Sequence, residues 1–247
     1  MLAGNIVQVR LERKALSAAV SPTCCSGREQ RSKTASAGSA IPIDDSPRSM
    51  KEKLRKQMRA QRRSLSTADH GRRSNLAAKA IAALPTFRSG KRIALYLPFD
   101  READTAPLIA AAARRGVRVF VPVIVDRRHS RIRFYPFDGT TRRGVFGIAV
   151  PKRMNRPMPP RWLDLIVIPL VGVDAAGRRL GMGGGFYDRA LEFRRRRRHW
   201  PGPHLVGLAF DCQRTESGFA EPWDVNLDSL ATEASHFSAP NHRPRRR

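Results

Sequence analysis

The segment 164–169, with the sequence DLIVIP, places the tightest limit on how this chain can fold. Its four central residues, Leu165 to Ile168, are all aliphatic, so neither side of the segment offers a polar face to water. Such runs are typical of strands in a parallel sheet that is covered on both faces. Other apolar runs alternate with helical patterns, as strand–helix–strand units do. We therefore predict one α/β domain with three layers, α/β/α, around a mostly parallel sheet.

The other elements follow from the period of the apolar residues. Leu54 and Met58 lie four residues apart on a helix that opens at Lys51. Ser66 is placed to cap a second helix, and Pro85 ends it. The predicted helices are 51–66, 66–84, 105–115 and 187–194, and the predicted strands are 92–97, 117–125, 131–137, 164–169, 205–210 and 227–232.

The ends of the chain differ from the middle. Residues 1–49 are rich in Ser, Ala, Thr and Gly and show no sustained apolar period, so we predict a disordered N-terminal extension. A mitochondrial transit peptide is one alternative, because the segment is rich in Arg and Ser. A start at Met50 is the alternative we favour, because the first strong helix opens directly after it. The folded domain is then 50–237, followed by a disordered basic tail at 238–247.

Composition excludes several classes of protein. A hydrophobic share of 41% can build a core, and no stretch approaches the roughly 20 apolar residues of a membrane helix. Three cysteines cannot make a disulfide framework, which favours a reducing, cytoplasmic location. The formal net charge is +26, from 47 Lys and Arg against 21 Asp and Glu. A solvated basic surface is the simplest interpretation, and attraction of nucleic acid or of a small anionic ligand is the alternative.

The segment 174–188, DAAGRRLGMGGGFYD, carries the strongest chemical signal. Glycine lacks a Cβ and reaches positive φ, so successive backbone N–H groups of such a segment can converge on an anion. A helix that follows adds the positive end of its dipole, and Arg178 and Arg179 could add charge-assisted bonds to phosphate. Asp188 could bind Mg²⁺ through oxygen. The spacing matches neither a P-loop nor a dinucleotide fingerprint, and a plain flexible turn is the alternative.

The blocks RLGMGGGFYDR at 179–189 and DLIVIPLVGVD at 164–174 resemble the signature of the 5-formyltetrahydrofolate cyclo-ligases, also called 5,10-methenyltetrahydrofolate synthetases. Further blocks agree in order: KEKLR at 51–55, LPFDREADT at 97–105, VGLAFDCQ at 206–213 and EPWDVNLDSLATE at 221–233. The resemblance covers about 50–235. It implies an enzyme that uses ATP and Mg²⁺ to convert 5-formyltetrahydrofolate, possibly polyglutamylated, into 5,10-methenyltetrahydrofolate, with release of ADP and phosphate. We expect a monomer without a membrane partner.

The resemblance also implies residue roles. Lys51, Arg55 and Arg179 would act on the ATP phosphates, and Asp188 and Asp224 would hold Mg²⁺. Leu97 and Glu102 would line the folate pocket, Glu102 through pterin N–H groups. The ATP loop would be Arg179, Leu180, Gly181, Met182, Gly183, Gly184, Gly185, Phe186 and Tyr187, of which Met182 to Phe186 would also face the folate.

Each of these residues also has a plainer interpretation. Lys51 and Arg55 could be solvated surface charges, and Leu97 could belong to the core. Glu102 could be a helix first-turn acid, and Asp224 could cap a turn. Several features depart from the family pattern, including Met182 and Trp223 at positions where other members vary. Phe186 stands where the family often has tyrosine, so Tyr187 must supply any phenol, and the arginine run 194–198 matches no motif. The net charge of +26 and the arginine runs leave a nucleic-acid-binding protein as an alternative function. A relative that binds nucleotide with another substrate is a further alternative.

Overall fold

The computed structural model describes residues 46–144, 147–196, 202–215, 221 and 223–238. These residues all fall within one compact unit. The predicted extension and the basic tail lie almost wholly outside them. Helix α1 begins at Pro47, ahead of the predicted boundary at residue 50, because Ser46 caps it by accepting a hydrogen bond from the Ser49 backbone N–H at 3.2 Å. None of the described helices is long and apolar enough to cross a membrane.

The main sheet has seven strands among the described residues, in the order β11-β10-β9-β6-β1-β2-β3. The five from β10 to β2 run parallel, and the edge strands β11 and β3 are antiparallel to their neighbours. Their bounds are β1 Arg92–Ala94, β2 Arg118–Asp126, β3 Arg131–Pro136, β6 Leu165–Pro169, β9 His204–Leu208, β10 Ser229–Ala231 and β11 His236–Ser238. The predicted mostly parallel sheet is confirmed. Strand β3 is antiparallel because only four residues join it to β2, too few for a parallel crossover.

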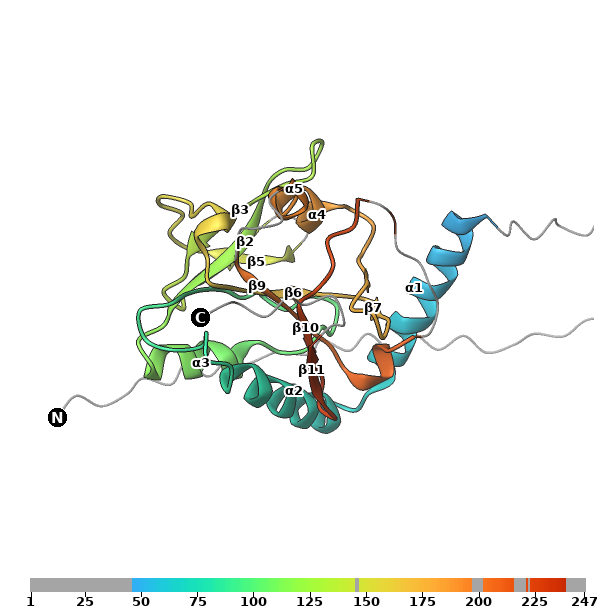
Figure 1. Ribbon diagram of the computed structural model, residues 1–247. Helices are drawn as coiled ribbons and strands as arrows, with labels where there is room; N and C mark the ends of the chain where they lie inside the picture. Colours follow the sequence, from blue (N-terminus) through green and yellow to red (C-terminus); the bar gives the residue numbers. More distant parts are fainter. Residues whose placement is uncertain (1–45, 145–146, 197–201, 216–220, 222, 239–247) are drawn as a thin grey trace, which may run out of the picture. The chain divides into compact units, whose positions relative to one another are not determined.

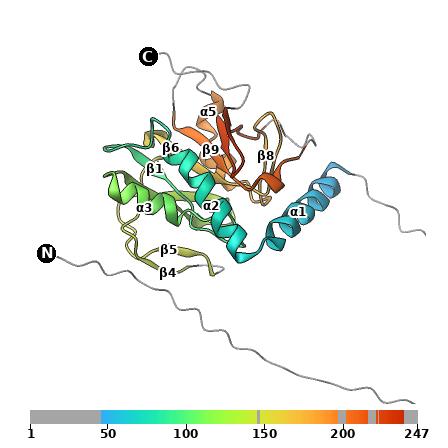
Figure 2. The same cartoon turned by 90° about the horizontal axis from the view of Figure 1, so that it is seen from below.

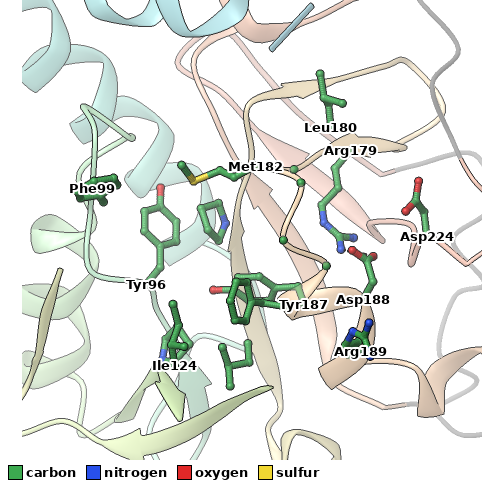
Figure 3. A pocket seen from close by; sticks show the side chains of 18 of the residues that line it. Tyr96, Phe99, Ile124, Arg179, Leu180, Met182, Tyr187, Asp188, Arg189 and Asp224 are labelled. Atoms are coloured by element: carbon green, nitrogen blue, oxygen red, sulfur yellow. Dashed lines mark hydrogen bonds and ion pairs between the residues drawn. The ribbon is translucent and has the colours of Figure 1, made fainter. Parts of the chain in front are cut away.

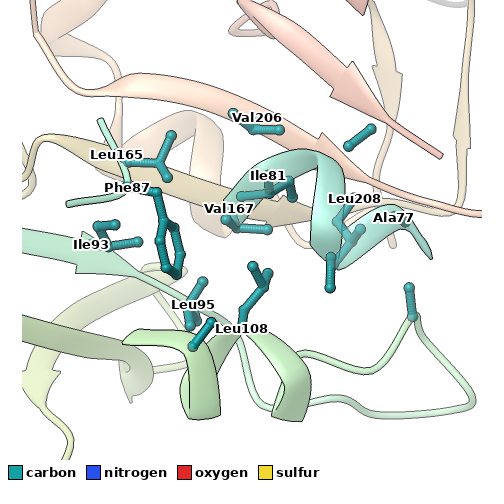
Figure 4. Packing of buried hydrophobic residues seen from close by; sticks show 14 of the residues in the cluster. Ala77, Ile81, Phe87, Ile93, Leu95, Leu108, Leu165, Val167, Val206 and Leu208 are labelled. Atoms are coloured by element: carbon teal, nitrogen blue, oxygen red, sulfur yellow. The ribbon is translucent and has the colours of Figure 1, made fainter. Parts of the chain in front are cut away.

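Helices cover both faces of this sheet. Helices α2 (Thr67–Ala82) and α3 (Ala106–Arg114) lie against one face, and α4 (Phe186–Ala190) and α5 (Phe193–Arg196) lie on the other (Figure 1). On the first face Ile81 and Leu108 pack against Val167 of the central strand, and all three are fully buried (Figure 4). On the second face Leu191 packs with Ile166 and Leu205. The predicted three-layer α/β/α class is therefore confirmed.

Helix α1 (Pro47–Ser64) stands at the side of the sheet rather than on a face (Figure 2). Its Met58 is buried, and the Met58 side chain lies 3.4 Å from the position where a Cβ on Gly172 would stand. Ser66 ends the turn between the two helices and caps α2, because its Oγ accepts a hydrogen bond from the Asp69 N–H at 3.0 Å. This cap confirms the start predicted for the second helix.

Two small hairpins were not predicted. Strands β4 (Thr141–Arg143) and β5 (Ala149–Pro151) form one, and β7 (Gly172–Val173) and β8 (Arg179–Leu180) form the other. The second hairpin stands between the buried strand β6 and the glycine segment, which were expected to be adjacent. The short helices η2 (Pro160–Trp162) and η3 (Asp211–Gln213) complete the fold. These hairpin strands have only two or three residues and no extended alternating run surrounds them, so they show no strand pattern.

Candidate functional site

One cavity of about 730 Å³ opens beside the carboxyl ends of the central strands. Helix α1, the loop after β1, strands β2 and β3, and the glycine segment all contribute to its wall. Figure 3 shows apolar side chains on one side of it and charged side chains on the other. It is lined by each residue that the sequence analysis selected for the site: Lys51, Arg55, Leu97, Glu102, Arg179, Leu180, Gly181, Met182, Gly183, Gly184, Gly185, Phe186, Tyr187, Asp188 and Asp224.

The glycine segment, residues 181–185, connects β8 to α4. Gly183 and Gly185 have φ of 96° and 64°, a backbone conformation that residues with a Cβ rarely adopt. A Cβ on Gly183 would also stand 3.6 Å from the guanidinium carbon of Arg55. Arg55 is held there because its Nε donates a hydrogen bond to the Gly181 carbonyl at 3.0 Å. The segment thus packs around an arginine of α1 in a defined conformation. It is therefore not the plain flexible turn that was the alternative interpretation.

The predicted helix 187–194 is broken into α4 and α5. Helix α4 has five residues and begins at Phe186. Its dipole is therefore weaker than that of the longer helix predicted over 187–194. Arg194 makes two hydrogen bonds to the Asp228 carboxylate, at 2.6 and 2.9 Å, and so fastens α5 beside β9. Arg195 lines the cavity and donates to the Trp223 carbonyl at 3.0 Å. Arg196 ends α5, and residues 197–198 of the arginine run lie outside the described residues.

Arg179 and Asp188 form the centre of the charged side. Arg179 is 7% exposed and donates hydrogen bonds to the Asp188 carboxylate and to the Val225 carbonyl. Asp188 Oδ1 also accepts from the Val225 N–H at 3.1 Å. These contacts attach the C-terminal segment to the glycine segment. The predicted metal ligand Asp188 therefore already has an arginine partner, and its charge is balanced inside the fold.

Glu221, which the sequence analysis did not select, pairs with Lys51 through a short contact between Oε1 and Nζ. Its backbone N–H donates to Asp224 Oδ2 at 2.9 Å. Asp224 therefore caps a turn, as its plainer interpretation had it, and it lines the cavity as well. Lys51 and Arg55 are half-buried and bonded, so they are not simply solvated.

Possible metal ligands are few. In the part of the chain that the structure describes, no three His, Cys, Asp or Glu residues come together as a metal site. Asp188 and Asp224 each already use one carboxylate oxygen in hydrogen bonds. Two carboxylates fit Mg²⁺ better than a tighter-binding metal, because Mg²⁺ keeps several waters and takes other ligands from phosphate.

The apolar side of the cavity surrounds Glu102. Tyr96, Phe99 and Ile124 lie on this side (Figure 3). Glu102 is 7% exposed, and its Oε2 accepts a hydrogen bond from the Phe99 N–H at 3.1 Å. Burial raises the pKa of this carboxyl to about 7. Glu102 precedes α3 by four residues, so it is not a first-turn helix acid. Leu97 is half-buried and lines the cavity rather than the core.

Two phenols lie near the same carboxyl, those of the buried Tyr96 and the half-buried Tyr187. Burial raises the pKa of Tyr96 well above its usual value, and the nearby Glu102 charge raises it further. The pKa of Tyr187 is raised by the same two causes. The Tyr96 hydroxyl donates to the Ala103 carbonyl at 2.8 Å, whereas the Tyr187 hydroxyl points into the cavity (Figure 3). Tyr187 thus presents the phenol expected from it in place of Phe186.

The loop that carries Phe99 and Glu102 is strained. Asp100 and Arg101 have φ of 51° and 57°, which is costly for residues other than glycine. Arg62 of α1 is 1% exposed and donates to the Asp100 carbonyl at 2.7 Å and to its carboxylate at 3.2 Å. Arg101 donates to the Leu65 carbonyl. Arg62 was missed, although Met58 and Arg62 are four residues apart and so share the buried face of α1.

The parallel sheet covered on both faces, with a cavity beside the carboxyl ends of its strands, is typical of an α/β enzyme. Residues 47–233 match the sequence model of the 5-formyltetrahydrofolate cyclo-ligase family, and the chain belongs to that family. The 5-formyltetrahydrofolate cyclo-ligase of Escherichia coli K12 is 34% identical over 178 residues, covering 71% of this chain and 96% of the relative. The Haemophilus influenzae 5-formyltetrahydrofolate cyclo-ligase is 38% identical over 145 residues, covering 57% and 74%.

Solved structures agree with this family. The NMR structure of 5,10-methenyltetrahydrofolate synthetase from Aquifex aeolicus superposes with a TM-score of 0.65 at 29% identity, covering 80% of this chain and 97% of that one. The synthetase from Mycoplasma pneumoniae gives a TM-score of 0.59 at 27% identity, covering 74% and 98%. The matches span nearly the full length of both solved chains.

Proposed function

We propose that this chain, a 5-formyltetrahydrofolate cyclo-ligase, uses ATP and Mg²⁺ to close 5-formyltetrahydrofolate into 5,10-methenyltetrahydrofolate, with release of ADP and phosphate. The observation that carries the proposal is the division of one cavity into two ends. One end gathers Lys51, Arg55 and Arg179 around a glycine segment, and the other surrounds a buried carboxyl with aromatic and aliphatic side chains. A phosphorylated nucleotide and a pterin need these two environments side by side.

The glycine end suits a triphosphate. The backbone N–H groups of 181–185 and the guanidinium of Arg55 lie together, and Lys51 is one helical turn away on α1. Lys51 would exchange its present partner Glu221 for a phosphate oxygen. Asp188 and Asp224 would hold Mg²⁺, which when bound neutralises charge on the transferring phosphoryl group.

The apolar end suits the folate. Glu102 would accept hydrogen bonds from pterin N–H groups, while Phe99 and Leu97 pack against the rings. Residues 182–186 line the same cavity. They would hold the formyl oxygen toward the terminal phosphate. Positioning is the main contribution required, because a phosphorylated formyl oxygen is a good leaving group when N10 closes the ring, whereas the free oxygen is a poor one.

The nucleic-acid alternative rested on the net charge of +26 and on the arginine runs. In the structure several arginines are committed to ion pairs inside the fold, among them Arg62, Arg73 and Arg194. Such arginines stabilise the domain rather than an interface with RNA. No specific observation favours this alternative or a different substrate at the nucleotide site.

The proposal is tested by absorbance of the methenyl product. We expect purified protein to form this chromophore from 5-formyltetrahydrofolate only when ATP and Mg²⁺ are both present. In Lys51→Ala the KM for ATP should rise about tenfold, because one charge-assisted bond to phosphate is lost, while the KM for folate changes little. Lys56→Ala is the matched control, since Lys56 is exposed on the same helix and does not line the cavity. Turnover without ATP, or a defect confined to folate, would contradict the assignment.

The raised pKa of Glu102 predicts a pH dependence for folate binding. Only the ionised carboxylate accepts two pterin hydrogen bonds, so the KM for folate should fall as the pH rises through about 7. In Glu102→Gln the KM should be higher and independent of pH in this range. Kinetics between pH 6 and 8 measure both, with Glu52→Gln, on the exposed part of α1, as the control. A wild-type KM that does not change with pH would contradict the role of Glu102.

The Glu102 carboxyl also determines how the stability of the protein changes with pH. Its pKa is 4.5 in an ordinary environment and about 7 in the folded protein, so the folded state binds the proton more tightly. The wild type should therefore lose stability as the pH rises from about 4.5 to about 7. Glu102→Gln should lack this part of the loss, which denaturant titrations at several pH values can measure.

A further inference from the structure

A second cavity of about 390 Å³ adjoins the first. The two share Pro122, Ile124 and Ile148, so they meet at the apolar end rather than at the glycine end. Ile124 lies on the Tyr96 side in Figure 3, opposite Arg179. The second cavity extends along the hairpin β4–β5, which the sequence analysis did not predict and which no step of the proposed reaction uses. An elongated ligand held at the apolar end could therefore continue into it.

The charged residues that line the second cavity, among the residues that the structure describes, are all positive. Arg142 and Arg143 line it, and no acidic residue does so among the residues that the structure describes. Both arginines are exposed on β4, and neither has a carboxylate within ion-pair distance in the described part of the chain. The other lining side chains, such as Val150 and Met154, are apolar. This cavity would take a ligand with an apolar stem and more than one negative charge.

We propose that Arg142 and Arg143 bind the carboxylates of the glutamate tail of the folate substrate, an inference that rests on the proposed function. A folate has a pterin at one end, an aminobenzoyl ring in the middle and a glutamate at the other end. With the pterin at Glu102, the ring lies along Ile124 and Ile148, and the tail reaches the hairpin. A guanidinium pairs with a carboxylate through two parallel hydrogen bonds, and each added γ-linked glutamate brings a further carboxylate.

This placement also separates like charges. The triphosphate end of the cavity holds Lys51, Arg55 and Arg179, and the tail end has its own two arginines. The two anionic parts of the substrate pair thus meet different cations on opposite sides of the apolar section. The reacting formyl group is left between them, facing the glycine segment.

The test compares three substrates: 5-formyltetrahydropteroate without glutamate, the form with one glutamate and the form with three. In the double variant Arg142→Gln/Arg143→Gln, the KM for the triglutamate should rise about tenfold, because charge-assisted bonds are lost. The kcat for all three, and the KM for the form without glutamate, should match the wild type. Arg133→Gln is the matched control, because Arg133 is exposed on β3 and points to the face opposite Ile132 of the cavity wall.

Equal KM changes for all three substrates, or none, would overturn the proposal. The conservative pair Arg142→Lys/Arg143→Lys, which keeps both charges, should recover most of the affinity for the triglutamate. Binding of the triglutamate and of the form without glutamate is also measured by calorimetry without ATP. If the wild type turns over no substrate, the proposed function fails. The calorimetry still decides the tail site, since weaker triglutamate binding in the double variant supports it and equal binding overturns it.

Discussion

Replacing Asp188 by asparagine should lower kcat/KM by a factor of about 1000 and leave the protein folded. Asparagine keeps an oxygen that can accept the hydrogen bonds from Arg179 and from the Val225 N–H. It removes the negative charge that would hold Mg²⁺ and balance Arg179. The loss should therefore appear in the chemical step, measured by product absorbance at saturating ATP, and the apparent affinity for Mg²⁺ should fall as well.

Asp228 provides the matched control for this change. It is also paired with an arginine, Arg194, and it also accepts a backbone hydrogen bond, from Leu205 at 2.8 Å. It does not line the cavity. Asp228→Asn should therefore lose a comparable amount of stability while its activity per folded molecule stays within about twofold of the wild type. Full activity of Asp188→Asn, or an equal loss in both variants, would contradict a role for Asp188 in the reaction.

Replacing Arg62 by methionine should lower the free energy of unfolding by about 3 kcal/mol and raise the KM for folate. The guanidinium is buried and holds the Asp100 carbonyl and carboxylate, so its loss leaves polar groups unpaired inside the protein. The strained backbone at Asp100 and Arg101 would then relax and move Phe99 and Glu102. Urea titrations measure the first effect, and kinetics with varied folate measure the second.

Arg63 shows how far this effect depends on burial. It also pairs with the Asp100 carboxylate, at 2.6 Å, but its side chain is 58% exposed. Arg63→Met should therefore cost less than about 1 kcal/mol, as exposed ion pairs do. If the two variants were equally stable, the buried guanidinium would not be what holds the loop.

The elements that were predicted correctly have either an apolar pattern that extends over many residues or a short characteristic sequence. Helices α1 and α2 follow from apolar residues at helical spacing, and strand β6 follows from a continuous apolar run. The glycine segment follows from its cluster of glycines, because residues with a Cβ rarely adopt the positive φ found there. Hairpin β7–β8 could not be predicted, because two-residue strands have no period. It changes the path of the chain into the glycine segment without changing where that segment lies.

The contacts that balance charge in the site could not be predicted from sequence. Glu221 is 170 residues from Lys51, so no spacing rule connects them. Arg179 and Asp188 are close in sequence, but nothing in their spacing shows that they pair rather than face a ligand separately. Arg62 was overlooked for a different reason, since arginine is expected to be exposed. Its position four residues after Met58 was the signal that could have found it.

Helix α1 carries Lys51 and Arg55 toward the proposed nucleotide end of the cavity and Arg62 toward the loop of Phe99 and Glu102. At a rise of 1.5 Å per residue, Lys51 and Arg62 are about 17 Å apart along the axis. A rigid-body displacement of this helix would disturb both halves of the site together. A protease cut between residues 51 and 62 should therefore abolish recognition of both substrates in a single event.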